Sequence, residues 1–175
     1  MVKKTYLFIV ITLLTGCSKL VDLKMKKAPY FGDELRIDGY YYSNPLYNKY
    51  ADITTIGVAV FYRDGFCIHT WGESANPDTL SYIENEILLN DALITKMKKN
   101  PSHIGAFQIM YTDIKFETWE LRNWVFTYYG KIVNDTTFII HKRMENNTGK
   151  IFSENSTYRF HQFSPKPDST NNFVK

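Results

Sequence analysis

The sequence predicts an all-β domain with one inserted helix, arranged as an eight-stranded antiparallel up-and-down barrel. Two observations predict it. Eight segments alternate with a period of two and are rich in aromatic and β-branched side chains, which is the pattern of strands. Most connections between them have the length and composition of hairpin turns. A meander of this kind removes its exposed edges by closing on itself.

The expected strands follow one another closely along the chain. Asp64-Gly65 is a hairpin signal between the second and third strands, and Asn134-Asp135 provides turn residues between the sixth and seventh. These short connections favour pairing between neighbours in sequence. The eight segments are 35–42, 54–63, 65–71, 103–111, 114–121, 123–133, 136–144 and 156–163.

One segment, between the third and fourth strands, has helical spacing instead. Acidic residues lie early in it, lysines lie late, and Pro101 follows it, as helix polarity predicts. We expect one substantial helix from Leu80 to Met97 that packs against the barrel exterior or across one end, with Asn90-Asp91 as a point of division. The apolar residues at helical spacing are Leu80, Ile83, Ile87, Ile94 and Met97.

Residues 1–16 have the pattern of a secretory signal peptide. Lys3 and Lys4 precede an apolar run over 5–14, and this run is much shorter than the roughly 20 residues that a membrane-spanning helix needs. A positive start, a short apolar stretch and a small residue at the cut are typical of export signals. We therefore expect residues 1–16 to be removed.

The next motif, Leu14-Thr15-Gly16-Cys17, resembles the lipobox of bacterial lipoproteins. The resemblance implies that the Cys17 thiol receives a diacylglycerol and that cleavage occurs just before it. Several acyl chains anchor a protein stably, whereas one chain binds only marginally. Because Ser18 is not an aspartate, the resemblance favours the outer membrane of a bacterial cell envelope, on either its periplasmic or its surface face.

Residues 17–34 form the expected lipid-anchored tether, and residues 35–175 form the barrel domain. The tether carries Lys19, Lys24, Lys26 and Lys27, which fit either a solvated linker or a segment lying on anionic headgroups. The C-terminal stretch SPKPDSTNNFVK is rich in proline and turn residues. We expect it to run as an irregular strap over the barrel.

The charge balance argues against a nucleic-acid partner, and the cysteine content argues against an intrachain disulfide. The chain has 21 Lys and Arg against 18 Asp and Glu, and loss of Lys3 and Lys4 with the signal peptide leaves 19 against 18. This balance provides no electrostatic footprint for nucleic acid. Once Cys17 carries lipid, only Cys67 remains as a thiol, so no intrachain disulfide is expected, and Cys67 is interpreted as a core residue.

No group of residues has the spacing of a catalytic or metal site. The four histidines lack the helical i, i+4 pairing and the Cys/His spacing of zinc sites. Asp113, Glu117 and Glu120 lie on or beside one strand, but nothing in the sequence brings two of them together in a cleft. Nucleophile-elbow, phosphate-loop and His-Glu-x-x-His motifs are missing from the sequence. We expect a protein that is not an enzyme and that has no metal and no cofactor.

The aromatic content is the unusual quantity, with 13 Tyr, 12 Phe and 3 Trp. Aromatic walls suit either a ligand cavity in the mouth of a small barrel or a purely aromatic core, and both interpretations are open at this point. A two-residue turn at Asn134-Asp135 would pair Tyr128 with His141. One face of that hairpin, expected inside the barrel with Trp124 beside a cavity, holds Trp124, Phe126, Tyr128, Ile132, Ile139 and His141.

The opposite face of the same hairpin is expected outside, because its lysines are rarely buried unpaired. A slip of one residue would invert the assignment. This second face holds Val125, Tyr129, Lys131, Phe138, Ile140 and Lys142.

The chain resembles the lipocalin-like small lipoproteins common in Bacteroidetes. The resemblance rests on the strand order, the tether, the lipobox and four stretches of sequence, and it covers the mature chain from about Leu35 to the end. The stretches are IDGYYYS, IGAFQIMYTDIKFETWEL, YGKIVNDTTFII and KPDSTNNF. True lipocalins have Gly-x-Trp on the first strand with an arginine packed on the tryptophan, whereas this chain has Gly39-Tyr40-Tyr41. In this resemblance Tyr41 replaces the indole, Arg159 stacks on it, and Tyr41 joins the candidate cavity residues. The resemblance implies a barrel and carries no established substrate.

We therefore expect a membrane-anchored lipoprotein whose barrel binds a small, partly apolar ligand. The alternative is a structural or assembly component of an envelope complex, with a protein partner and no small ligand. A pocket of about 300 Å³ or more inside the barrel would favour the first interpretation, and an interior filled by side chains the second.

Overall fold

The structure, a computed structural model, describes residues 21–48, 52–73, 78–121 and 124–175. Its strands form one antiparallel sheet, in which β1 pairs with both β9 and β3 and so closes the barrel. Eight strands make the closed barrel, and the short β2 pairs only with the edge of β3. The strands are β1 (Gly39–Ser43), β2 (Leu46–Asn48), β3 (Ile53–Phe61), β4 (Phe66–Glu73), β5 (Ile104–Met110), β6 (Asp113–Leu121), β7 (Trp124–Asn134), β8 (Thr137–Glu145) and β9 (Ile151–Gln162).

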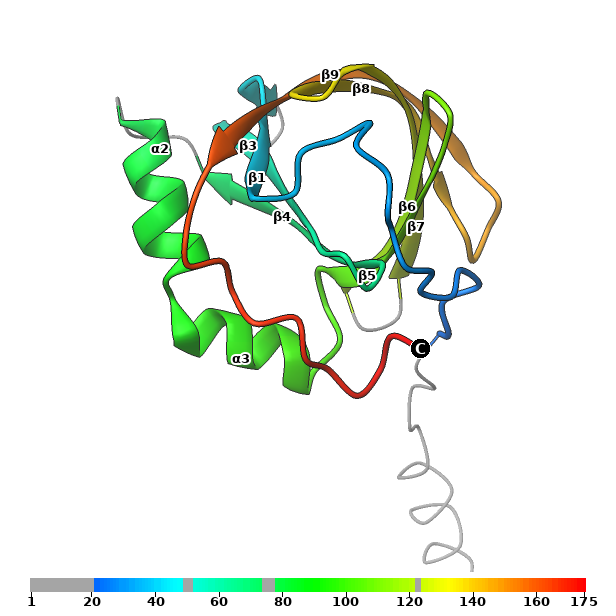
Figure 1. The fold of residues 1–175 in the computed structure, drawn as a ribbon, viewed down its shortest axis with the longest axis horizontal. Coiled ribbons are helices and arrows are strands. Elements are labelled where there is room, and N and C mark those ends of the chain that lie inside the picture. The colour runs from blue at the N-terminus through cyan, green and yellow to red at the C-terminus, as the bar shows by residue number, and fades with distance from the viewer. Residues whose placement is uncertain (1–20, 49–51, 74–77, 122–123) are drawn as a thin grey trace, which may run out of the picture.

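The predicted eight-stranded up-and-down barrel is therefore confirmed, and so is the helical insertion after its third strand, β4. The insertion consists of α2 (Thr79–Tyr82), the π-helical turn η1 (Ile83–Leu88) and α3 (Asp91–Lys99). The division falls where it was expected, since the Asn90 side chain caps α3 by accepting a hydrogen bond from the Leu93 N–H at 3.0 Å. Figure 1 shows these helices beside the barrel, on the side of β3 and β4.

The apolar side chains form two cores, one on each side of the barrel wall. The outer core lies between the outer faces of the strands, the helices and the two terminal segments. Strand β3 is buried on both faces, because Val58 belongs to the outer core and Phe61 to the inner one. The inner core fills the barrel from alternate strand positions, among them Tyr41, Phe61, Phe107, Phe116 and Phe138. From the helices, the outer core takes Ile83, Ile87, Leu88, Ile94 and Met97.

The N-terminal segment from Val21 lies against the barrel and is not a solvated linker. Met25 and Tyr30 are buried, the Trp119 indole N–H donates to the Val21 carbonyl at 2.6 Å, and the Lys27 N–H donates to the Lys175 carbonyl at 2.8 Å. The prediction of a solvated tether is therefore wrong for residues 21–34, because apolar side chains in this segment find partners on distant strands. Residues 1–20, with Cys17 and the predicted signal peptide, lie outside the described residues.

The same segment then closes one end of the barrel. Leu35 belongs to the inner core, the Tyr30 N–H donates to the Arg63 carbonyl, and the Arg36 N–H donates to the Asp135 carbonyl, each of these two bonds at 2.9 Å. Both acceptors lie beside hairpin turns, so the segment spans the end where β3–β4 and β7–β8 turn. In Figure 1 it is the blue stretch that crosses the barrel opening.

The C-terminal segment is an irregular strap, as expected from its composition. Phe173 and Val174 pack on the outer core, and the Tyr62 hydroxyl donates to the Pro167 carbonyl at 2.7 Å. The Lys98 ammonium forms an ion pair with Asp168 at 3.0 Å, which ties the strap to α3. Figure 1 shows this red segment passing close to α3.

The predicted register of the β7–β8 hairpin is wrong. Asn134 pairs with Thr137 and Tyr128 with Arg143, whereas the prediction paired Tyr128 with His141. The Asn134 side chain accepts from the Thr136 N–H at 3.0 Å and shifts the turn by one residue. Two bulges then change the pairing again along the strands.

These shifts invert the predicted faces over the first half of β8, and the bulge at His141 restores them from Lys142 onward. Phe138 and Ile140, which were expected outside, are fully buried in the inner core, and Ile139 and His141 lie on the other face. The prediction for β7 is right for Phe126 and Tyr128, which are also part of the inner core. Two lysines of the hairpin lie on the outer face, as expected from their charge, namely Lys131 and Lys142.

Candidate functional site

Aromatic rings occupy the barrel interior next to its covered end. The rings of Phe61 and Phe107 have centroids 4.8 Å apart, and Phe138 stacks on Tyr158 at 4.8 Å. Tyr41 packs on Phe138 at 5.1 Å, and its hydroxyl donates to the Arg36 carbonyl at 2.9 Å. At this level the interior is an aromatic core, because the rings contact one another.

Titratable side chains gather inside the opposite end of the barrel. Five strands contribute to this inner polar cluster, and alternation along each strand turns the contributing residues inward. Its members are His69 on β4, Glu120 on β6, Tyr128 on β7, Arg143 on β8, and Glu154 and Tyr158 on β9.

The contacts within the inner polar cluster run across the barrel. His69 Nε2 lies 2.8 Å from the Tyr158 hydroxyl oxygen, and His69 Nδ1 lies 3.7 Å from Glu120 Oε1. The Tyr128 hydroxyl donates to the same Glu120 oxygen. The 3.7 Å contact is too long for a hydrogen bond.

Burial and the neighbouring polar groups shift the pKa values of these side chains in opposite directions. Burial raises the pKa of Glu120, but the His69 imidazole and the Tyr128 hydroxyl outweigh it, so this pKa lies below its usual value. Burial raises the pKa of Glu154, and the nearby Arg143 guanidinium offsets this only in part. Burial also raises the pKa of the Tyr158 hydroxyl well above its usual value. The two carboxyl groups of the cluster thus differ in how readily they ionise.

Several buried polar atoms of this end have no hydrogen-bond partner within the described residues, namely His69 Nδ1, His103 Nδ1, Thr118 Oγ1 and Arg143 Nε. Arg143 Nε lies 2.9 Å from Glu154 Oε1, close enough for an ion pair but without the alignment of a hydrogen bond. Unsatisfied buried groups are costly, and a bound water or ligand is the usual reason that they persist.

Two charged side chains at this end are partly exposed to solvent. The side chain of Arg143 is 31% exposed, and that of Glu154 is 15% exposed. The Arg143 guanidinium lies 5.2 Å from the centroid of the Phe126 ring and 5.1 Å from that of Phe152. Two aromatic rings, a cation and a carboxylate therefore lie together at this end of the barrel.

The structure separates the predicted cavity residues into groups. Phe126 and Tyr128 lie at the inner polar cluster, whereas Tyr41 lies in the aromatic core near the covered end. Ile132 is half-buried and packs against the inner core. Trp124 is 53% exposed, so its predicted inward position is wrong.

The two remaining candidates, Ile139 and His141, are on the outside of β8, for the register reason given above. The stacking of Arg159 on Tyr41 is also wrong. Tyr41 pairs with Phe160, whose ring lies 5.3 Å away, and Arg159 is exposed with its guanidinium bonded to Asn44. The aromatic residue Phe160 therefore takes the place expected for the arginine.

Sequence reasoning considered His69 and Glu120 but did not bring them together, and it missed Arg143 and Glu154. The usable signal was a charged residue at an inward position of a predicted strand. On β8 the signal was present, because Arg143 has the parity of the predicted inner face, but on β9 it was hidden, because Glu154 precedes the predicted strand 156–163.

The fold and the site define a closed antiparallel β-barrel with a polar cluster inside one end. No protein-family model, no curated protein and no solved structure matches this chain. Among residues 21–48, 52–73, 78–121 and 124–175, no helix is long and apolar enough to cross a membrane. Within the same ranges, no group of three His, Cys, Asp or Glu side chains could hold a metal ion.

Proposed function

We propose that this protein is a lipid-anchored binding protein of the bacterial cell envelope, and that its barrel takes a small, partly apolar ligand at the end that holds the inner polar cluster. The observation that carries the proposal is the unpartnered Arg143 Nε, which is buried although its side chain is 31% exposed at this end. This atom offers a hydrogen bond to a ligand that reaches the rim from solvent.

The rim of this end suits a ligand with an apolar body and one polar group. The half-buried Phe152 supplies apolar surface, while Arg143 and Glu154 supply a donor and an acceptor. The aromatic core beneath them limits how deep the ligand can go. The proposed site is therefore a shallow one in the barrel mouth rather than a deep cavity.

Binding rather than catalysis is proposed because the acid–base groups are packed tightly. The Tyr158 hydroxyl is fully buried and engaged by His69, and the Glu120 oxygen that lies nearest His69 also accepts from Tyr128. Neither arrangement leaves space for a reacting group beside these atoms.

The cellular part of the proposal rests on the N-terminal sequence. Leu14-Thr15-Gly16-Cys17 matches a lipobox, and Cys17 would carry the lipid, with the outer membrane favoured. Replacing Cys17 by serine should release the protein from membranes in cell fractionation. Lipidation of Cys17 would be contradicted if the Cys17→Ser protein stayed in the membrane fraction and its mass showed the same modification as that of the unchanged protein.

The ligand site is tested with 8-anilinonaphthalene-1-sulfonate, which has an apolar ring system and an anionic head. The full chain should enhance its fluorescence. The double variant Arg143→Gln/Glu154→Gln removes both charges of the rim together and should weaken binding about tenfold, the equivalent of one charge-assisted hydrogen bond.

The matched control is Arg159→Gln, since Arg159 is exposed on the outer face of β9. It should bind the probe as the unchanged protein does. Equal affinity of the double variant and the control would contradict a site in the barrel mouth. That outcome would favour the second candidate function, a structural component of an envelope complex, which the aromatic filling of the interior supports.

A further inference from the structure

Two hollows adjoin each other on the outer surface of β5–β8. Their volumes are about 250 Å³ and about 220 Å³, and Gln108, Lys115 and Tyr129 line both of them. The first also touches the N-terminal segment, and the second extends toward Lys142. Together they form one groove along the barrel wall, away from the inner polar cluster.

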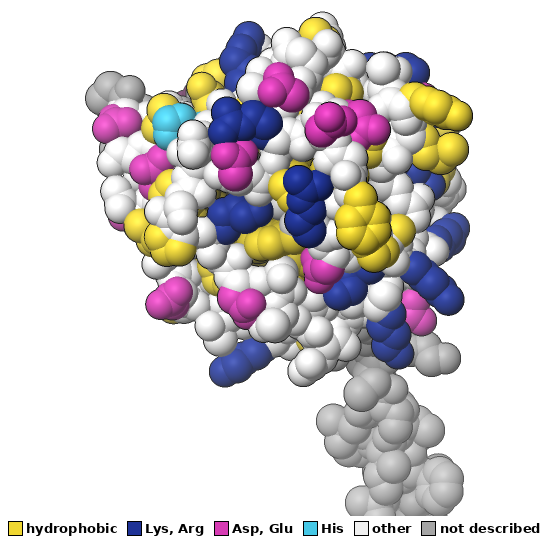
Figure 2. Space-filling model, in the orientation of Figure 1, with side chains coloured by type: hydrophobic (Ala, Val, Ile, Leu, Met, Phe, Trp, Pro, Cys, Tyr) yellow, Lys and Arg dark blue, Asp and Glu magenta, His cyan; other side chains and the backbone are white. Residues whose placement is uncertain are grey.

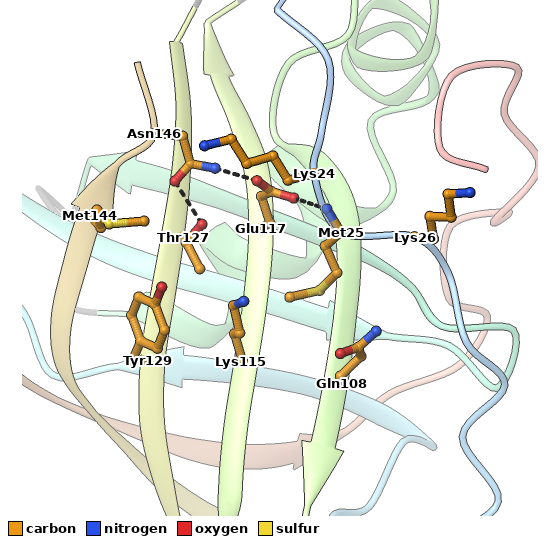
Figure 3. A pocket seen from close by; sticks show the side chains of 10 residues that line it. All are labelled: Lys24, Met25, Lys26, Gln108, Lys115, Glu117, Thr127, Tyr129, Met144 and Asn146. Carbon is orange, nitrogen blue, oxygen red and sulfur yellow. Dashed lines mark hydrogen bonds between the residues drawn. The ribbon is translucent and has the colours of Figure 1, made fainter. Parts of the chain in front are cut away.

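The carboxylate at the floor of the first hollow is already engaged (Figure 3). Glu117 is 1% exposed, accepts from the Met25 N–H at 2.5 Å and accepts from the Asn146 amide. The Asn146 carbonyl in turn accepts from the Thr127 hydroxyl at 2.7 Å. These bonds hold the N-terminal segment on β6 and leave two of its lysines beside the hollow, Lys24 and Lys26.

Lysine side chains dominate the charge of the groove. The ammonium groups of Lys115 and Lys142 lie 5.6 Å and 4.5 Å from the centroid of the Tyr129 ring. The second carboxylate at the groove, Asp113, is already paired with Lys131 at 2.6 Å. Figure 2 shows Lys and Arg side chains along this edge of the molecule.

Four lysines of the groove have no carboxylate partner among the described residues. We call them the lysine face, and they are Lys24, Lys26, Lys115 and Lys142. Two come from the N-terminal segment and two from the barrel wall, and the Met25–Glu117 bond fixes the first pair next to the second. The face is therefore a preformed cationic surface.

We propose that the lysine face docks on a lipid bilayer that carries anionic phosphate headgroups. The inference rests on the lipid anchor of the proposed function. Cys17 precedes Val21 by four positions, and the Val21 carbonyl is held by Trp119, so the anchor point can lie no more than about 14 Å from the barrel surface. A lipid on Cys17 would keep the lysine face close to the headgroups, where each lysine strengthens binding.

The test measures binding of the full chain carrying Cys17→Ser to vesicles by co-sedimentation, so that it does not depend on lipidation. Vesicles of phosphatidylcholine are compared with vesicles that also contain phosphatidylglycerol. Binding should be tighter on the anionic vesicles and should weaken as salt is added. Removing Lys115 and Lys142 as Lys115→Gln/Lys142→Gln should reduce that preference by about tenfold or more at low salt.

The matched control is Lys96→Gln/Lys99→Gln, which removes the same charge from two exposed lysines of α3. It should keep the preference for anionic vesicles. An equal loss in both variants would show that only net charge matters and would overturn the proposal, as would equal binding of the unchanged chain to both vesicle types. Lipidation of Cys17 is measured separately, from the mass of the chain and from fractionation after a high-salt wash that removes binding through the lysines, so the two proposals fail separately.

Discussion

His69 and Tyr158 are 89 residues apart in the sequence, and inside the barrel His69 Nε2 lies 2.8 Å from the Tyr158 hydroxyl oxygen. His69 is on β4 and Tyr158 on β9, two strands that are not neighbours in the sheet. The contact therefore crosses the barrel, and it exists only because the sheet closes. It links the inner polar cluster to the aromatic core through the stacking of Tyr158 on Phe138.

Removal of this hydroxyl should destabilise the fold. Tyr158→Phe leaves His69 Nε2 buried without its partner, which costs about 1–3 kcal/mol. The free energy of unfolding from urea denaturation measures the change. Tyr111→Phe is the control because Tyr111 is 86% exposed, and it should change stability by less than about 0.5 kcal/mol. Similar values for both variants would argue against the contact.

Glu120 should make stability depend on acid pH. Its pKa in the folded protein lies below its usual value of 4.5, since its polar neighbours outweigh burial. A lowered carboxyl pKa stabilises the fold above the unfolded value, and this contribution is lost as the pH falls through the folded value. Thermal unfolding of Glu120→Gln should therefore show a smaller loss of stability below about pH 4.5 than the unchanged protein.

Glu86→Gln is the matched control for that measurement, because Glu86 is exposed on η1. Its pH profile should follow that of the unchanged protein. If the pH profile of Glu120→Gln also matched that of the unchanged protein in the acid range, Glu120 would not be the cause of the loss of stability there.

Lys166 should make stability depend on alkaline pH. Its ammonium donates to the carbonyls of Ile37 at 2.5 Å and Phe61 at 2.9 Å, and burial lowers its pKa from 10.5 to about 8. The unfolded chain then binds more protons than the folded one between these values, so this group makes stability rise from about pH 8 to 10.5. Thermal unfolding should show that Lys166→Met loses this contribution, whereas Lys150→Met at an exposed site keeps it.

The helical insertion is tested at its contact with the outer core. Ile87 is 3% exposed and Leu89 is 48% exposed, and the two residues lie close together at the end of η1. Ile87→Asp would bury a charge without a partner and should destabilise the protein by more than about 3 kcal/mol. Leu89→Asp should have an effect of less than about 0.5 kcal/mol on urea denaturation. Equal effects would mean that η1 does not pack as described.

Several features of the fold follow from the sequence alone. The period of two in the strands and the helical spacing between Leu80 and Met97 predict the barrel and its insertion, because both patterns arise within a single segment. Asn90 predicts the division of the helix for the same reason, since a cap acts on the N–H groups of the next turn. The motif that resembles a lipobox at Cys17 is also local, and lipidation of Cys17 stays a prediction.

The tertiary structure decided how these segments face one another. Glu117 holds Met25 across 92 residues, and Trp119 holds Val21 across 98, so residues 21–34, predicted as part of a tether, pack against the barrel. In the β7–β8 pair, a bulge at Val133 placed Phe138 and Ile140 inside, and a second bulge at His141 left that residue outside. Alternation within a strand is set by local backbone geometry, whereas register and closure depend on many weak contacts between strands, and a shift of one residue reverses every side chain.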